Sequence, residues 1–166
     1  MKKTKKLTVS ALSAAMCVAI MSIGSLISSL DVSLALIAGL VIMVIDVEYG
    51  YRSALAVYLA AGLLSFLLPE KSPGILFLAL LGWYPIAQKK LNMIKPVFSL
   101  AAKFVLFNGI LFMLLYLTAF VTGIRDAAWV NITLVVMGNI CFYMYDFLLD
   151  RFFLFYLLKI RKRIKF

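Results

Sequence analysis

Six apolar segments, separated by short polar turns, restrict this chain to the membrane. Hydrophobic residues make up 65% of its 166 residues, and its mean hydropathy is +1.07. A soluble domain of this size needs far more polar surface. A membrane-spanning helix takes roughly 20 apolar residues, so this length has room for about six helices and no soluble domain. We therefore expect an all-α integral membrane protein, with residues 1–166 forming a single bundle of six transmembrane helices.

Polar and turn-forming residues separate the apolar segments. These segments cover about residues 8–28, 32–45, 53–68, 74–91, 97–121 and 129–153. The first ends at a polar group that includes Asp31, and a charged turn with Asp46, Glu48 and Gly50 follows the second. The second segment, with about 14 apolar residues, barely crosses a bilayer and is re-entrant in an alternative interpretation. In the fourth, we expect Pro85 to kink or open the helix.

Basic residues gather on one side of these spans. If the N-terminus lies in the cytoplasm, the outer loops hold Lys71 and Arg125. The inner flanks then hold Lys2, Lys3, Lys5, Lys6, Arg52, Lys89, Lys90, Lys95, Lys159, Arg161, Lys162, Arg163 and Lys165. Because basic flanks stay in the cytoplasm, this bias predicts a multi-pass plasma-membrane protein with both termini cytoplasmic. Its basic tails, at about 1–7 and 157–166, are expected to rest against anionic lipid headgroups.

The basic ends also admit two other interpretations. A net charge of +10 is compatible with nucleic-acid binding, but the bundle leaves no folded surface to present to bases, so we expect no nucleic-acid partner. The first segment also resembles a secretory signal, basic and then apolar. Its apolar run is longer than a typical signal core, so we interpret it as the first span.

Catalytic and metal-binding residue patterns do not occur in the sequence. Histidine is absent, which removes the usual general base near neutral pH and most transition-metal sites. Cys17 and Cys141 lie inside apolar runs, far from any ligand spacing, and are expected to be small buried residues. We expect no catalytic residues, no metal and no cofactor, and a membrane-embedded enzyme is a poorly supported alternative.

Three alanines recur every fourth position in the first segment. Ala11, Ala15 and Ala19 fall on one stripe of a helix, where small side chains let another backbone approach closely. Lipid gains nothing from such a stripe, whereas a partner helix does. The spacing therefore predicts a surface on which a partner helix docks.

Charged residues within the last two segments need a reason, because a charge at membrane depth costs a few kcal/mol. Lys103 enters the fifth segment about two turns from its cytoplasmic start, and Asp146 and Asp150 lie at a similar depth in the sixth. We expect an intramembrane ion pair between Lys103 and one of these aspartates. The alternatives are a Lys103 side chain that extends to the headgroups and a proton or ion relay.

Amides also lie within these two segments. Asn131, Val135 and Asn139 share an arc of the sixth helix that we expect to face the bundle. With Asn108 and Tyr116 of the fifth segment, they are candidates to line a ligand cavity. The alternative is plain hydrogen bonding between two helices.

The expected topology and the first segment together resemble a known family. Six short helices with both ends inside, and a first helix that opens KKLTVSALSAAMCVAIM, are similar to the substrate-binding S component of energy-coupling factor (ECF) transporters. Ala11, Ala15 and Ala19 match the Ala-x-x-x-Ala motif of that family. The resemblance implies that the chain binds a vitamin-like small molecule or a metal ion near the outer face. It also implies that the alanine face docks on a transmembrane coupling protein that two cytoplasmic ATPases drive.

A second family is similar in length and helix count. The small membrane subunit of the bacterial rod-shape machinery is a scaffold that binds other membrane proteins and has no ligand cavity. The sequence leaves both interpretations open: a substrate-binding subunit and a scaffold that transports nothing.

Overall fold

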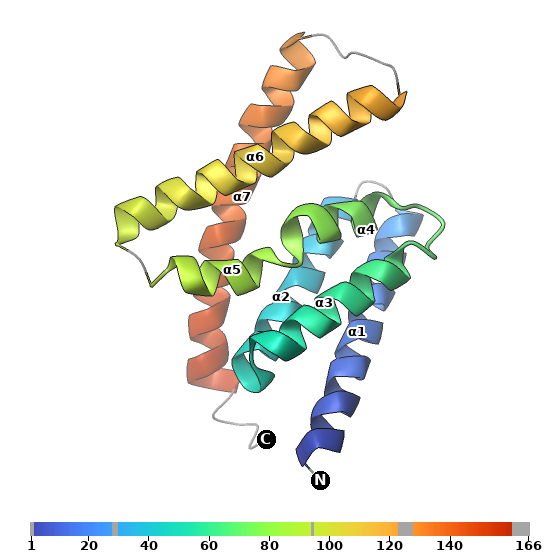
Figure 1. Cartoon of the computed structure of the whole chain (residues 1–166), viewed down its shortest axis with the longest axis vertical. Helices are drawn as coiled ribbons and strands as arrows, with labels where there is room; N and C mark the ends of the chain where they lie inside the picture. The colour runs from blue at the N-terminus through green and yellow to red at the C-terminus, as the bar shows by residue number, and fades with distance from the viewer. Residues whose placement is uncertain (1, 28–29, 94, 123–127, 161–166) are drawn as a thin grey trace. The chain divides into compact units, whose positions relative to one another are not determined.

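The structure, a computed structural model, describes residues 2–27, 30–93, 95–122 and 128–160, and every regular element in them is helical (Figure 1). The elements are α1 (Lys2–Leu26), α2 (Asp31–Tyr49), α3 (Tyr51–Ser65), α4 (Ser72–Leu76), the π-helix η2 (Phe77–Leu81), α5 (Tyr84–Leu91), α6 (Pro96–Thr122), α7 (Ala128–Phe155) and the π-helix η3 (Tyr156–Ile160). The chain divides into two compact units. Unit 1 comprises Met1–Lys89 and Arg151–Phe166, and unit 2 comprises Lys90–Asp150.

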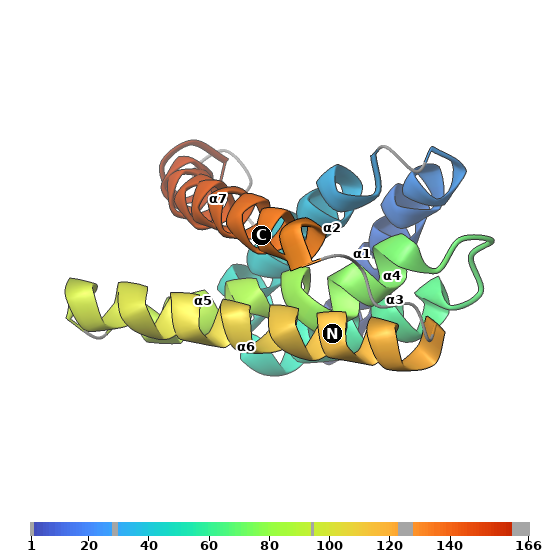
Figure 2. The ribbon, with the colours of Figure 1, turned by 90° about the horizontal axis from the view of Figure 1, so that it is seen from above.

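Unit 1 is built on three helices that pack through small side chains. α1, α2 and α3 each contact the other two, and they lie together in both views (Figures 1 and 2). Ala35 and Ala38 of α2 and Ala54 and Ala61 of α3 are fully buried. Because alanine adds only a methyl group to the backbone, helices with such residues at their contacts approach closely.

The second helix is longer than the sequence predicted. α2 has 19 residues, so the short segment expected at 32–45 is long enough to span. Asp31 and Asp46, expected in loops, instead lie within α2 and are buried. The helix continues past Asp46 because that carboxylate meets a cation at 2.8 Å. The turn between α2 and α3 is therefore the single residue Gly50. Its φ is +81°, a value that glycine adopts readily and that is disfavoured for other residues.

The third and fourth segments are shorter than expected. α3 has 15 residues, about 22 Å at 1.5 Å per residue, against a hydrocarbon core of roughly 30 Å. The fourth segment, expected as one span, is divided among α4, η2 and α5. It breaks before Pro85, at Gly82 and Trp83, and Pro85 lies in the first turn of α5, where a proline is tolerated.

Side chains from other positions stabilise this break. The hydroxyl of Tyr58 donates to the carbonyl of Leu78 at 2.7 Å, and Trp83 Nε1 donates to the carbonyl of Ala79 at 2.8 Å. A π-helix disturbs the regular pairing of its carbonyls, and these donors satisfy two of them. A Cβ on Gly82 would lie 2.6 Å from Tyr58 Cδ2, so only glycine fits there without a shift.

Unit 2 pairs the two longest helices, α6 and α7. Phe107 and Phe142 stack with ring centroids 4.3 Å apart, and Phe104 meets Phe142 edge-on at 5.6 Å. Such aromatic contacts add to the hydrophobic gain of burial. They fix which sides of α6 and α7 face each other, and therefore which polar residues meet.

Four helices among the described residues are long and apolar enough to cross a membrane: Thr4–Leu26, Asp31–Tyr49, Phe98–Phe120 and Val130–Lys159. They indicate an all-α membrane protein. The count of six spans, the single bundle and the cytoplasmic termini stay predictions. Arg125 and the basic tail from residue 161 onward lie outside the described residues.

Candidate functional site

The alanine stripe lies on the exposed side of α1. Ala11, Ala15 and Ala19 are all exposed. The side that packs within unit 1 carries Cys17, which is fully buried and donates from Sγ to the carbonyl of Ala38 at 3.7 Å. The packing of unit 1 therefore uses another face of α1 and leaves the stripe uncovered.

Larger apolar side chains border the stripe. Leu12 is 70% exposed, and Met16 and Ile23 are about half exposed. Positions 12 and 16 form the neighbouring row on the helix surface, and position 23 continues the row of the alanines at the same four-residue spacing. The exposed face is thus a stripe of small side chains with larger apolar side chains along one edge and at one end, and the small residues let a partner helix approach closely.

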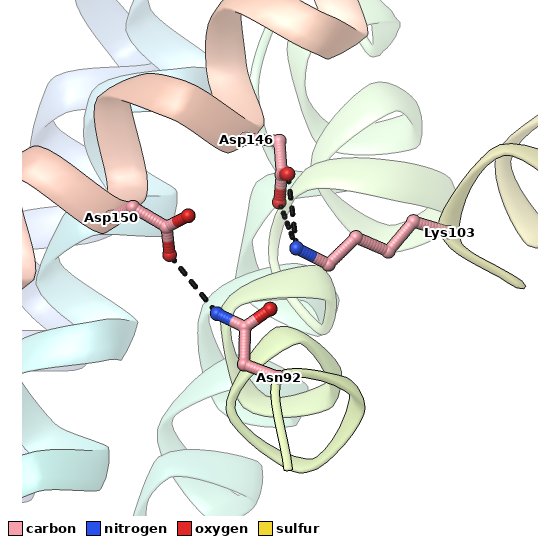
Figure 3. A network of polar contacts seen from close by, with 4 residues as sticks. All are labelled: Asn92, Lys103, Asp146 and Asp150. Atoms are coloured by element: carbon pink, nitrogen blue, oxygen red, sulfur yellow. Dashed lines mark hydrogen bonds and ion pairs between the residues drawn. The ribbon is translucent and has the colours of Figure 1, made fainter. Parts of the chain in front are cut away.

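The predicted intramembrane charges meet in unit 2. Lys103 Nζ lies 2.9 Å from both carboxylate oxygens of Asp146 (Figure 3). The Lys103 side chain is only 5% exposed and that of Asp146 11%, so the lysine is held inside the protein and does not extend to the headgroups. Of the two predicted partners, the structure brings Asp146 to Lys103.

Asp150 has a different neighbour. It follows Asp146 by one turn of α7, and its Oδ1 accepts a hydrogen bond from Asn92 Nδ2 at 3.0 Å (Figure 3). Asn92 lies in the turn after α5. An asparagine in a turn is common, so nothing in the sequence marked this one as a partner of Asp150.

The amides predicted to line a cavity bond to each other. Asn108 Nδ2 donates to Asn139 Oδ1 at 2.8 Å, and Asn139 Nδ2 donates to Asn108 Oδ1 at 2.9 Å. Each amide nitrogen also donates to a carbonyl of its own helix, that of Phe104 or of Val135. Both amides are therefore engaged in joining α6 to α7, as the alternative of plain helix–helix hydrogen bonding describes.

The other three cavity candidates, Tyr116, Asn131 and Val135, lie outside the amide pair. Tyr116 is 76% exposed and lies on a part of the α6 surface away from the amide pair. Asn131 and Val135 are half-buried, and the carbonyl of Val135 accepts from Asn139 at 2.8 Å. Unit 2 thus holds an amide pair near the middle of its helices, with Tyr116 apart from it.

A second polar group, in unit 1, was missed at the sequence level. Lys89 Nζ lies 2.8 Å from Asp46 Oδ2, and the hydroxyl of Tyr156 donates to Glu48 Oε1 at 3.2 Å. The partners are separated by 43 and 108 positions. Charges at the end of an apolar segment are ordinarily interpreted as solvated, so only the fold brings these groups together.

No group of three or more His, Cys, Asp or Glu side chains arranged to hold a metal ion occurs in the described part of the chain. Comparisons of the chain with protein families, with characterised proteins and with solved structures find no match.

Proposed function

We propose that this chain is the membrane-embedded substrate-binding subunit of an ECF-type importer. The observation that carries the proposal is the exposed stripe of Ala11, Ala15 and Ala19 on α1, beside a packed face that holds Cys17. In lipid, helix association depends on close van der Waals contact, which small residues permit. A helix that packs on one side and presents an exposed alanine stripe on another is suited to bind one more helix.

In this proposal the chain crosses the plasma membrane six times with both termini in the cytoplasm. The short α3 and the broken fourth segment then complete the count by local thinning of the bilayer around them. The partner is a transmembrane coupling protein, which cytoplasmic ATPases energise. The cargo is a vitamin-like small molecule captured near the outer face.

A scaffold that transports nothing, similar to the small membrane subunit of the rod-shape machinery, is the second candidate. One observation favours it: the amides of Asn108 and Asn139 satisfy each other and two backbone carbonyls. A ligand that displaced this pair would have to replace those hydrogen bonds, since a buried amide left unsatisfied is costly. The scaffold needs the exposed stripe but no cavity.

Mass spectrometry of the native complex, purified in mild detergent, separates the two candidates. The importer subunit is expected to carry a coupling protein, a pair of ATPases and a bound small molecule. Adding that molecule should raise the melting temperature by several degrees, as mass action requires of a ligand that binds the folded state. Copurification of cell-shape proteins, with no small molecule and no thermal shift, would reject the importer in favour of the scaffold.

A further inference from the structure

Residues in the last turn of α2 make two contacts with the chain, one where the chain leaves unit 1 and one where it returns. The chain passes into unit 2 between Lys89 and Lys90, and it returns between Asp150 and Arg151. Lys89, the last residue before the first exit, binds Asp46 at 2.8 Å. Shortly after the return, the hydroxyl of Tyr156 donates a hydrogen bond to Glu48 Oε1 at 3.2 Å. Each of these contacts lies within unit 1.

The two contacts differ in how open they are to competition. Tyr156 is 3% exposed, so its hydroxyl is shielded from water. The Lys89 side chain is 54% exposed, whereas that of Asp46 is 3% exposed. Water, salt or another anion can therefore reach the ammonium of Lys89 while Asp46 stays buried. The chain leaves unit 1 at Lys89, so this connection depends on the Asp46–Lys89 ion pair, which is easier to open than the Tyr156–Glu48 hydrogen bond.

Asp46 is also incompletely satisfied. Its Oδ1 is buried and has no hydrogen-bond partner among the described residues, so Lys89 compensates this carboxylate through Oδ2 alone. A buried carboxylate that loses its cation is strongly destabilised. The free energy that would be lost by leaving the Asp46 carboxylate unpaired therefore stabilises the ion pair, and Oδ1 of Asp46 adds no further hydrogen bond to it.

α5 is the element that this contact fixes. It has eight residues, too few for a helix to be stable by its own backbone hydrogen bonds. Tyr84, Pro85, Ile86 and Gln88 of this helix are buried. Its last turn, residues 88–91, is held by buried Gln88 and by the ion pair of Lys89 with Asp46, and the ion pair is the one of these two that solvent can reach.

We propose that the Asp46–Lys89 ion pair is a latch on α5, whose opening unwinds the last turn of this helix. The latch is independent of the importer assignment, because it involves neither the alanine stripe nor a ligand. Closed, it anchors the last turn of α5 to α2. Open, it removes this anchor.

Limited trypsin digestion of the purified protein tests the latch, because Lys90 lies in the last turn of α5 and cleavage after it requires this turn to open. When opening is fast relative to cleavage, the rate follows the open population. Asp46→Asn is expected to speed cleavage there about tenfold, the factor for about 1.4 kcal/mol of opening free energy. Cleavage after Lys5, in the first turn of α1, should keep its rate and serves as the internal reference.

Asp31→Asn is the matched control, because Asp31 is the other buried carboxylate of α2 with an unpartnered Oδ1. It should leave the ratio of cleavage after Lys90 to cleavage after Lys5 unchanged. An equal acceleration in Asp31→Asn and Asp46→Asn, or none in Asp46→Asn, would overturn the latch. Lys89→Arg keeps the charge and should retain the slow rate.

A salt titration of the unmodified chain keeps the test independent of whether Asp46→Asn folds. Because Lys89 is half exposed, raising salt from about 0.05 to about 0.5 M should weaken the pair by screening. Cleavage after Lys90 should then rise severalfold relative to cleavage after Lys5. A ratio that does not respond to salt would contradict a latch that opens at Lys89.

Discussion

Unit 1 and unit 2 hold their helices together by different chemistry. In unit 1, fully buried alanines such as Ala35, Ala38 and Ala61 let three helices approach one another. In unit 2, phenylalanine stacking, an amide pair and the Lys103–Asp146 ion pair join α6 to α7. The polar residues of unit 2 are thus engaged with one another, whereas the alanine stripe of unit 1 is left uncovered. Of these two surfaces, the uncovered stripe on α1 is therefore the one suited to a partner helix.

The largest effect is expected from breaking the ion pair of unit 2. Asp146→Leu leaves the Lys103 ammonium buried without a counter-ion, and removing one partner of a buried pair costs about 3–5 kcal/mol. Thermal unfolding in detergent should show a large drop in the melting temperature. Lys103→Met should give a comparable loss, because it leaves the Asp146 carboxylate unpaired.

The double variant sharpens this prediction. Lys103→Met with Asp146→Leu replaces both charges by apolar groups of similar size, an exchange that is often neutral or stabilising. It should recover most of the stability that either single change loses. Losses that add in the double variant would show that the two side chains do not act as a pair.

An intermediate effect is expected in unit 1 from filling a close contact. A methyl group on Gly82 would lie 2.6 Å from the ring of Tyr58 and 2.8 Å from that of Phe77. Gly82→Ala should therefore destabilise the protein by about 1–3 kcal/mol through overpacking. Chemical or thermal denaturation followed by circular dichroism measures the change.

Gly109 in α6 is the matched control in unit 2. A methyl group there meets nothing within 4 Å, so Gly109→Ala should be neutral or stabilise by up to about 1 kcal/mol through helix propensity. Similar losses at both glycines would mean that the close packing of unit 1 does not set it apart from unit 2.

The smallest effect is expected at the amide pair. Asn108→Ala removes two interhelical hydrogen bonds, and such contacts in membrane helices average about 0.6 kcal/mol, with a maximum near 1.7. The free energy of unfolding should fall by about 1 kcal/mol. If a ligand binds at this pair, Asn108→Ala should also abolish the thermal shift that the ligand produces, and an unchanged shift would place the ligand elsewhere.

Much of the helical order could be predicted from hydropathy, because a bilayer requires long apolar helices. Most described residues of the predicted apolar segments are helical, and the polar residues Lys103 and Asp146 were recognised because a charge in an apolar run needs a partner. The division of the fourth segment was not foreseen in full. It depends on Tyr58 and Trp83, which satisfy carbonyls of the π-helix from positions that hydropathy does not single out.

The contacts of Asp46 with Lys89 and of Asp150 with Asn92 escaped prediction for the same reason. Each joins residues that are distant in sequence and typical of turns or membrane interfaces. Sequence spacing identifies which residues share a helix face, but it does not say which face a distant segment covers. The sequence likewise does not show which side of α1 packs within unit 1. The structure buries the side that carries Cys17 and leaves the alanine stripe exposed.

Docking of a partner helix on the stripe is tested most directly by Ala15→Trp, compared with Ala60→Trp, which alters an exposed alanine of α3. A bulky ring at Ala15 prevents close approach to the stripe and should reduce recovery of the coupling partner in detergent pull-downs by at least about tenfold, or about 1.4 kcal/mol. The melting temperature should stay near that of the unmodified chain, and Ala60→Trp should retain the partner. If Ala15→Trp retains the partner as well as Ala60→Trp does, α1 is not the docking helix.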